Sequence, residues 1–326
     1  MVKNSIKAAL LALVAIVLCS CAQEKDETNK SIQQRILNAY LNTEEFKKEH
    51  PNAQILPSGL VMLGFEQGTG ETLDKLEGAY IEYTTTTLSG EHVTTTDENI
   101  AKSTGSFSHS NYYGPKLLSI GYKTEYIGLE EVLIGMKKGG KAQFILPPWL
   151  SRSENDPSWG NQSSVIYTLE LTDVITDILT WEEDTMKAYA NIHYPGLDTL
   201  SSNFYFKKLI ELPEADSLED GSIAVRYVGR LLDGWVFDTN IADTAKKYGI
   251  YDSSKDYEPM EISYNPDEDE MLNANSSVTG FIKALYRMKA GEAAFTMFGS
   301  KYGYDYEGSD PIGPYQPLIF WLYIEP

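Results

Sequence analysis

Hydrophobic and polar residues alternate along much of this chain, which is the pattern of strands that bury one face. Residues 223–228 (IAVRYV) alternate in this way, and residues 318–324 (LIFWLYI) form an apolar run that we expect to be a closing strand. Between these segments, Leu-Asp-Gly-Trp at 232–235 has the turn residues of a β-hairpin. The pattern therefore predicts antiparallel strands.

Two longer segments instead place apolar residues three and four positions apart, which is the spacing of an amphipathic helix. One lies in residues 31–50, behind a capping-box sequence, and the other in residues 178–198, behind a capping box that begins at Thr180. Short helices are expected after Gly128 and Gly280. Many strands with a few helices on one face predict an α+β fold.

The body of the chain contains two copies of one unit. Tyr83 recurs as Tyr227 at an offset of 144 residues, and Gly128 recurs as Gly280 at an offset of 152. The larger offset means that the second copy carries an extra loop segment. A chain of 326 residues is long enough for two domains, which agrees with a duplication.

The N-terminus resembles a bacterial lipoprotein signal peptide. Lys3 and Lys7 precede the apolar run 8–18, which is too short to span a bilayer as a helix, and a lipobox-like sequence ends in Cys21. The resemblance implies lipidation of Cys21, and Ala22 after it is similar to outer-membrane sorting signals. An ordinary signal peptide or a buried helix is the alternative. We expect a cell-envelope, outer-membrane lipoprotein of a Gram-negative bacterium, either periplasmic or surface-exposed.

These patterns divide the chain into six segments. They are a signal peptide (1–20), a flexible tether (21–30), an N-terminal helix (31–50), a first domain (51–177), a linker helix (178–198) and a second domain (199–326). The tether is polar throughout, which favours an unfolded linker.

The charge balance and the residue spacings exclude several functions. The chain has 27 Lys and Arg against 47 Asp and Glu, a net charge of −20, which argues against nucleic acid as a partner. Its two cysteines, Cys19 and Cys21, cannot build a disulfide framework. The acidic run 267–270 lacks the spacing of a calcium loop and favours a solvated loop. We find no metal-ligand spacing and expect no metal and no cofactor.

Four stretches of the second unit resemble an FKBP-type peptidyl-prolyl cis-trans isomerase domain. They are VRYVGRLLDGWVFDTN (225–240), VTGFIKALYRMKAGEAAFTM (278–297), SKYGY (300–304) and IGPYQPLIF (312–320). The first unit resembles the same family through EQGTGE (66–71), GLEEVLIGMKKGGKAQFILPP (128–148) and VIYTLEL (165–171). The resemblance implies, for each domain, a five- or six-stranded antiparallel sheet wrapped on one short helix, with the pocket between them.

The chemistry that this family performs suits the residues present. The barrier to rotation about a peptide bond is about 18–20 kcal/mol, and no proton transfer is needed to lower it. A dry aromatic cleft that fits the twisted amide, with a hydrogen-bond donor to the carbonyl, is sufficient. The second unit has aromatic residues in abundance and contains no histidine.

The resemblance also assigns residues. Catalytic roles fall on Tyr227, Phe237, Asp238, Val278, Phe281, Tyr304 and Phe320, and substrate binding falls on Met260 and Ile312. Tyr304 stands where the family places the tyrosine that donates to the carbonyl. Phe281 stands where the family usually has tryptophan, and Met260 where an aromatic is common. These departures leave reduced activity as the expectation.

The first unit departs further from the pattern. Tyr83 and Tyr167 remain, but residues 93–94 (Val-Thr) replace the Phe-Asp pair. Leu129 replaces the aromatic residue of the floor, and Arg152 stands at the position of the donor tyrosine. A charged arginine is costly to bury in such a cleft. We therefore expect a non-catalytic copy that serves as a substrate arm or a spacer.

One apolar surface is not explained by the resemblance. Strand parity points Ile319, Trp321 and Tyr323 away from the core, together with Phe295 and Met297. Such a face usually marks a docking surface. We expect the linker helix, the first unit or a partner protein to cover it.

The sequence favours a peptidyl-prolyl isomerase (rotamase) that helps exported proteins to fold and acts through its second domain. Its partners would be proline-containing segments of those proteins, and it would contact the membrane only through the Cys21 lipid. The main alternative is a non-catalytic FKBP-like lipoprotein that binds peptides or a partner protein. A glycan-binding protein is a weaker alternative, supported only by exposed aromatic residues near acidic ones.

Overall fold

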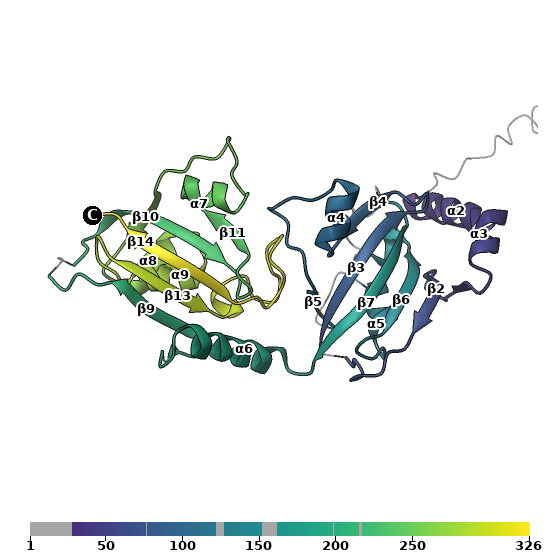
Figure 1. The fold of residues 1–326 in the computed structure, drawn as a ribbon, viewed down its shortest axis with the longest axis horizontal. Helices are drawn as coiled ribbons and strands as arrows, with labels where there is room; N and C mark the ends of the chain where they lie inside the picture. The colour runs from purple at the N-terminus through teal and green to yellow at the C-terminus, as the bar shows by residue number, and fades with distance from the viewer. Residues whose placement is uncertain (1–27, 76, 122–126, 152–161, 198, 215–216) are drawn as a thin grey trace, which may run out of the picture.

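Two α+β units follow one another along the chain and are joined by helix α6 (Ile178–His193) (Figure 1). The computed structural model describes residues 28–75, 77–121, 127–151, 162–197, 199–214 and 217–326. The expected signal peptide, Cys21 and Arg152 lie outside the described residues. Among the described residues, no helix combines the length and the apolar composition needed to cross a bilayer.

The first unit is built on an antiparallel sheet in the order β1-β2-β6-β7-β3-β4, with β5 paired to β3. Its strands are β1 (Gln54–Ile55), β2 (Val61–Glu66), β3 (Gly78–Thr87), β4 (His92–Thr95), β5 (Lys116–Ser119), β6 (Lys141–Leu146) and β7 (Val165–Ile175). Its helices are α2 (Asn29–Leu41), α3 (Glu44–Glu49), α4 (Glu98–Thr104), α5 (Ile127–Leu133) and the 3-10 turn η1 (Pro148–Leu150).

The second unit repeats this sheet as β8-β9-β13-β14-β10-β11, with β12 paired to β10. Its strands are β8 (Thr199–Ser201), β9 (Phe204–Ile210), β10 (Gly221–Arg230), β11 (Val236–Thr239), β12 (Met260–Tyr264), β13 (Ala293–Phe298) and β14 (Leu318–Ile324). Its helices are α7 (Ala242–Lys247), α8 (Glu268–Ala274), α9 (Thr279–Leu285) and the 3-10 turn η3 (Ser300–Tyr302). The strand orders match position by position, so the two units share one topology, as expected of two copies of one unit.

The α+β class is confirmed, and the expected number of strands is corrected. Each sheet has seven strands rather than five or six. The additional pairing comes from short strands at the margins, such as β1 and β8, whose two or three residues carry little hydrophobic pattern.

The short helix of each unit lies so close to its sheet that only glycine fits at the contact. A Cβ atom on Gly280 of α9 would lie 2.3 Å from the ring of Phe298, and one on Gly128 of α5 would lie 2.2 Å from Leu146. The two glycines recur at equivalent places because the close helix–sheet contact recurs.

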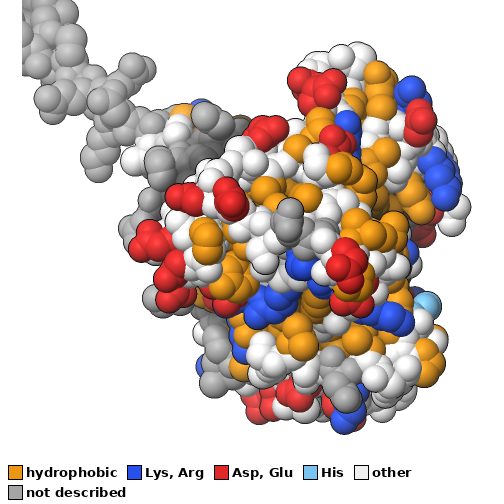
Figure 2. Space-filling view, turned by 90° about the vertical axis from the view of Figure 1, so that its left-hand side faces the viewer, with side chains coloured by type: hydrophobic (Ala, Val, Ile, Leu, Met, Phe, Trp, Pro, Cys, Tyr) orange, Lys and Arg blue, Asp and Glu red, His pale blue; other side chains and the backbone are white. Residues whose placement is uncertain are grey.

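Helix α6 covers the apolar outer face of the second sheet. Phe295, Met297 and Ile319 are fully buried there against Met186 and Ala190 of the helix. The parity predicted for β14 is confirmed, and the linker helix is the element seen on this face. On the end of the second unit shown in Figure 2, acidic, basic and hydrophobic side chains are interspersed.

The helix starts differ from those expected. The capping boxes place the starts at Ser31 and Thr180, but the N-caps are Thr28 and Asp177. The Asp177 side chain accepts a hydrogen bond from the Thr180 N–H, so the expected cap residue is instead in the first turn.

The prediction of a loop for the acidic run 267–270 is wrong, because this run begins helix α8. Asp267 is the N-cap, and its side chain accepts from the N–H groups of Asp269 and Glu270. Glu268 forms ion pairs with Lys283 and Arg287. Carboxylates in the first turn are favourable at the positive end of a helix.

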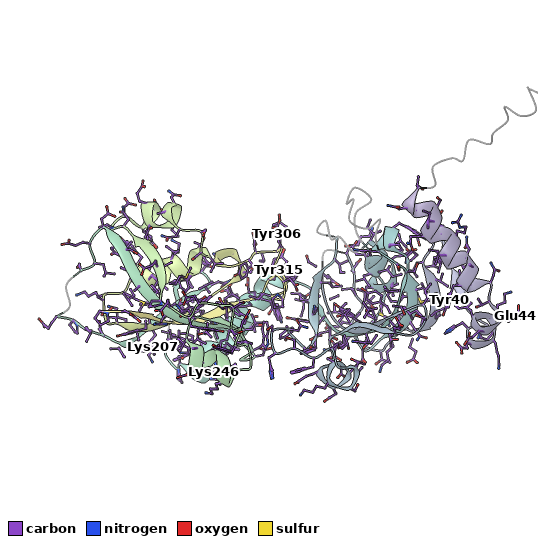
Figure 3. All side chains as sticks on the ribbon, turned by 90° about the horizontal axis from the view of Figure 1, so that it is seen from above. Tyr40, Glu44, Lys207, Lys246, Tyr306 and Tyr315 are labelled. Carbon is purple, nitrogen blue, oxygen red and sulfur yellow. The ribbon has the colours of Figure 1, made fainter. Side chains whose placement is uncertain are left out.

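Two loops bring the units into contact. The segment 305–317 extends from the second unit, and Tyr315 and Tyr306 lie on it between the two units (Figure 3). Tyr315 is buried in a small cluster with Leu117 and Ile175 of the first unit. The segment 105–114 extends from the end of α4 toward β11 (Figure 1).

Candidate active site

Phe320, on the central strand β14, is the hub of an aromatic pocket in the second unit. Its ring centroid lies 5.2 Å from Phe281, 5.7 Å from Phe237, 5.8 Å from Phe298 and 6.3 Å from Tyr227. The contacts to Phe281 and Phe237 are edge-to-face, an arrangement that aromatic rings favour. Four residues expected at the site from sequence are thus brought together.

The pocket needs a glycine beneath its rings. A Cβ atom on Gly229 of β10 would lie 2.7 Å from the ring of Phe237 and 2.8 Å from the ring of Phe320. The absence of a side chain at this position leaves room for the edges of both rings against the strand. Phe281, buried at 3% exposure, forms the floor in place of the expected tryptophan.

Asp238 lies on β11 at the polar edge of this pocket. Its Oδ2 accepts a hydrogen bond of 2.6 Å from the hydroxyl of Tyr227, and its Oδ1 accepts from the Thr239 N–H at 2.9 Å. Lys255 forms an ion pair with the same carboxylate. Burial, followed by the bond to Asp238, raises the pKa of the Tyr227 phenol, so this hydroxyl stays a donor.

Tyr304 lies on the loop that follows η3 and packs against the pocket cluster. Burial, followed by the negative charge of Asp238, raises the pKa of its phenol. Within the described part of the chain, the Tyr304 hydroxyl makes no hydrogen bond. It is therefore a protonated, half-buried donor that a bound carbonyl oxygen could accept from.

The remaining expected residues frame the pocket. Val278 is the N-cap of α9, and its carbonyl accepts from the Phe281 N–H at 3.0 Å. Ile312, at 6% exposure, belongs to the same buried cluster. Met260 pairs with Val225 at the start of β12 and is 37% exposed, so it lies at the open edge and not inside.

Two contributors to this site were missed by the sequence reading. Lys255 comes from the connection between β11 and β12 and contacts the Asp238 carboxylate. Glu182 of α6 accepts hydrogen bonds from the N–H and the hydroxyl of Ser300, at the base of the loop that carries Tyr304. Neither contact has a local sequence signal, because each joins residues far apart in the chain.

The chemistry of this site is that of an apolar, aromatic cleft with hydrogen-bond donors at one edge. Within the described ranges, no group of three or more His, Cys, Asp or Glu side chains is placed to hold a metal ion. The arrangement suits binding of a small apolar ring with a carbonyl beside it.

A comparison with known families matches the part of the chain that carries this pocket. Residues 215–324 match the FKBP-type peptidyl-prolyl cis-trans isomerase family. The match confirms the family resemblance expected for the second unit. It lies entirely within that unit, which we call the FKBP-type domain below.

Several solved structures are similar to this chain. A peptidyl-prolyl cis-trans isomerase from Pseudomonas syringae is 25% identical, with a TM-score of 0.33, over 46% of this chain and 92% of the other. The structure of the three FKBP domains of wheat FKBP73 is 16% identical, with a TM-score of 0.29, over 82% of this chain and 94% of the other. FkpA from Escherichia coli is 19% identical, with a TM-score of 0.32, over 45% of this chain and 57% of the other. No curated protein matches this chain.

In its described residues, the first unit lacks the features that define the pocket of the FKBP-type domain. Tyr83 and Tyr167 keep a ring contact at 5.5 Å, and Leu129 is buried at the position of the floor. Val93 and Thr94, which replace the Phe-Asp pair, are both exposed on β4. These placements agree with a copy that has lost the aromatic wall.

Proposed function

We propose that the FKBP-type domain catalyses cis–trans isomerisation of X–Pro bonds in exported proteins. The observation that carries the proposal is the Tyr304 hydroxyl, which has no hydrogen-bond partner among the described residues, beside an aromatic pocket centred on Phe320. The proline ring would enter the pocket, and the carbonyl before it would accept the hydrogen bond from Tyr304.

Catalysis would come from a better fit to the twisted amide than to the planar one. In the twisted state the carbonyl loses its resonance with the nitrogen, and a dry aromatic wall around Phe281 and Phe237 accommodates the turned ring. Each 1.36 kcal/mol by which the site favours the twisted state over the planar one gives about tenfold in rate. Asp238 would hold Tyr227 in place, and Lys255 would balance the charge of Asp238.

A protease-coupled proline isomerisation assay on the chain from residue 22 onward tests this function. We expect the wild type to exceed the uncatalysed rate. We expect Tyr304→Phe and Asp238→Ala each to lower kcat/KM by about tenfold. Tyr40→Phe, a change on helix α2 of the first unit, is the matched control and should leave the rate unchanged.

A non-catalytic peptide-binding protein is the second candidate, and two observations favour it. Phe281 is smaller than the tryptophan usual in the family, and Lys255 closes over the carboxylate of Asp238 at the pocket edge. A wild-type rate equal to that of buffer alone, together with measurable binding of proline peptides, would select this alternative.

We further propose that the protein is anchored to the outer membrane by a lipid on Cys21, with the first unit acting as a non-catalytic copy. Support comes from the order of basic residues, apolar run and lipobox-like sequence in residues 1–21. Mass spectrometry of the protein from membranes should find acyl groups on Cys21. A Cys21→Ser variant recovered unchanged in the membrane fraction would contradict the anchor.

A further inference from the structure

The first unit contacts the FKBP-type domain beside the candidate pocket. The ring of Tyr112, on the segment 105–114, lies 5.4 Å from the ring of Trp235 in an edge-to-face contact. Burial, followed by the negative charge of Asp233 in the β10–β11 hairpin, raises the pKa of the Tyr112 phenol. Tyr112 therefore packs against the core cluster of the other unit.

A row of aromatic rings leads from this contact into the pocket. Trp235 lies 6.4 Å from Phe237, and Phe237 lies 5.7 Å from Phe320. Tyr112, Trp235 and Phe237 are all partly exposed. The row continues the apolar wall of the pocket onto the first unit.

A cavity of about 230 Å³ lies between the two units next to this row. Its lining includes Ser106, Asn111, Tyr112 and Lys116 of the first unit, and Asp310 and Pro311 of the FKBP-type domain. Hydroxyl and amide groups predominate, with one ammonium and one carboxylate. These groups both donate and accept hydrogen bonds, as a peptide backbone requires.

The cavity and the pocket share one loop of the FKBP-type domain. Asp310 and Pro311 line the cavity, the adjoining Ile312 belongs to the pocket cluster, and Tyr304 lies at the start of the same loop. The charge of Asp310 also reaches Tyr83 of the first unit, whose pKa is raised by burial and then by this charge. A chain that fills the pocket can therefore continue into the cavity along this loop.

We propose that the cavity between the units is a subsite for the polypeptide segment that flanks the bound proline, with Tyr112 as its contact residue. This inference rests on the proposed function, because the proline is bound in the pocket described above. The first unit is then part of the substrate cleft, and its lost pocket has been replaced by a polar wall.

The test uses the full chain and two substrates with the same X–Pro bond. One is a tetrapeptide that fills only the pocket, and the other carries eight uncharged polar residues on each side of that bond. We expect Tyr112→Ala to raise KM for the long peptide about tenfold with kcat kept, and to leave the tetrapeptide unaffected. Asn111→Trp, which fills the cavity from an exposed position, should act in the same way.

Two variants control for folding and for the ring itself. Tyr112→Phe keeps the ring and should retain activity on the long peptide, and Phe65→Ala alters an exposed aromatic on β2 and should change neither substrate. Equal losses on both substrates would overturn the inference, because Tyr112 would then merely support the pocket. No loss on either substrate would overturn it as well.

Binding measurements separate this inference from the proposed function. Calorimetry should show that the wild type binds the long peptide more tightly than the tetrapeptide. The Tyr112→Ala variant should bind the two peptides with equal affinity. That result supports the subsite even where turnover is absent, in which case only the proposed isomerase activity fails. A wild type that binds both peptides equally would overturn the subsite.

Discussion

Glu182 and Ser300 are joined by two hydrogen bonds across 118 residues of sequence. The carboxylate lies on the linker helix, and Ser300 begins the turn that leads to Tyr304. Both residues are buried, at 2% and 1% exposure. The helix that covers the outer face of the second sheet therefore also holds the loop of the candidate active site.

Removal of this contact should weaken the site from a distance. Glu182→Ala leaves a buried N–H and a buried hydroxyl without an acceptor, which costs about 1–3 kcal/mol for each group. We expect a lower kcat on proline peptides, together with a reduced free energy of unfolding. Glu182→Gln retains an acceptor oxygen and should restore most of both, which a general loss of packing would not explain.

The same carboxylate should make stability depend on pH. Burial raises the pKa of Glu182 above its usual 4.5, and Asp305 adds to the shift, while the bonds from Ser300 and the charge of Lys301 oppose it. Glu182 therefore keeps its proton to a higher pH in the folded state than in the unfolded state. Its contribution to the free energy of unfolding is present at low pH and is lost as the pH rises. Urea unfolding of wild type and Glu182→Gln should show the variant gaining relative stability between pH 4 and pH 7. A constant difference would contradict this assignment.

The stability that Glu292 contributes should depend on pH in the opposite direction. It is fully buried, and burial alone would raise its pKa, but the Lys208 ammonium and the N–H groups of Leu212 and Lys289 outweigh burial and hold the pKa below its usual range. Its contribution is present at neutral pH and is lost as pH falls. Glu292→Ala leaves Lys208 without its partner and should cost about 3–5 kcal/mol at pH 7, measured by urea unfolding. A loss below 1 kcal/mol would show that the pair is effectively solvated.

Gly229 should be required for activity more than for stability. In Gly229→Ala the new Cβ atom displaces the ring edges of Phe237 and Phe320, which can move, and alanine gains about 0.5–1 kcal/mol over glycine within a strand. We expect kcat/KM to fall by about tenfold with a small change in unfolding free energy. Gly64→Ala, where a Cβ atom meets nothing within 4 Å, is the matched control. Unchanged activity in Gly229→Ala would mean that these rings do not shape the substrate site.

Local pattern was sufficient for much of the fold. The hairpin at 232–235 and the inward and outward faces of 318–324 follow from turn chemistry and strand parity, which neighbouring residues determine. The two helices begin earlier than predicted, because Thr28 and Asp177 can cap a helix as well as the predicted cap residues Ser31 and Thr180 can.

Contacts between distant segments were beyond the sequence patterns. Glu268 belongs to a helix because Asp267 caps it, and two cations, Lys283 of α9 and Arg287 after the end of α9, balance its charge. The pocket aromatics were found through a family resemblance. Lys255 and Tyr112 were not found, because they come from an added loop and from the other unit, which no motif describes.

Because α6 covers the second sheet, the repeated unit includes the helix that precedes each sheet. Leu37 of α2 lies beside Val61 at a shallow groove on the first unit, and Val61 occupies the strand position of Tyr205, which α6 helps to bury in the second. In both units, therefore, the helix that precedes the sheet packs on the strand that follows it. A fragment cut at residue 199 would discard half of a hydrophobic interface, whereas one that starts at Asp177 keeps the helix together with its sheet.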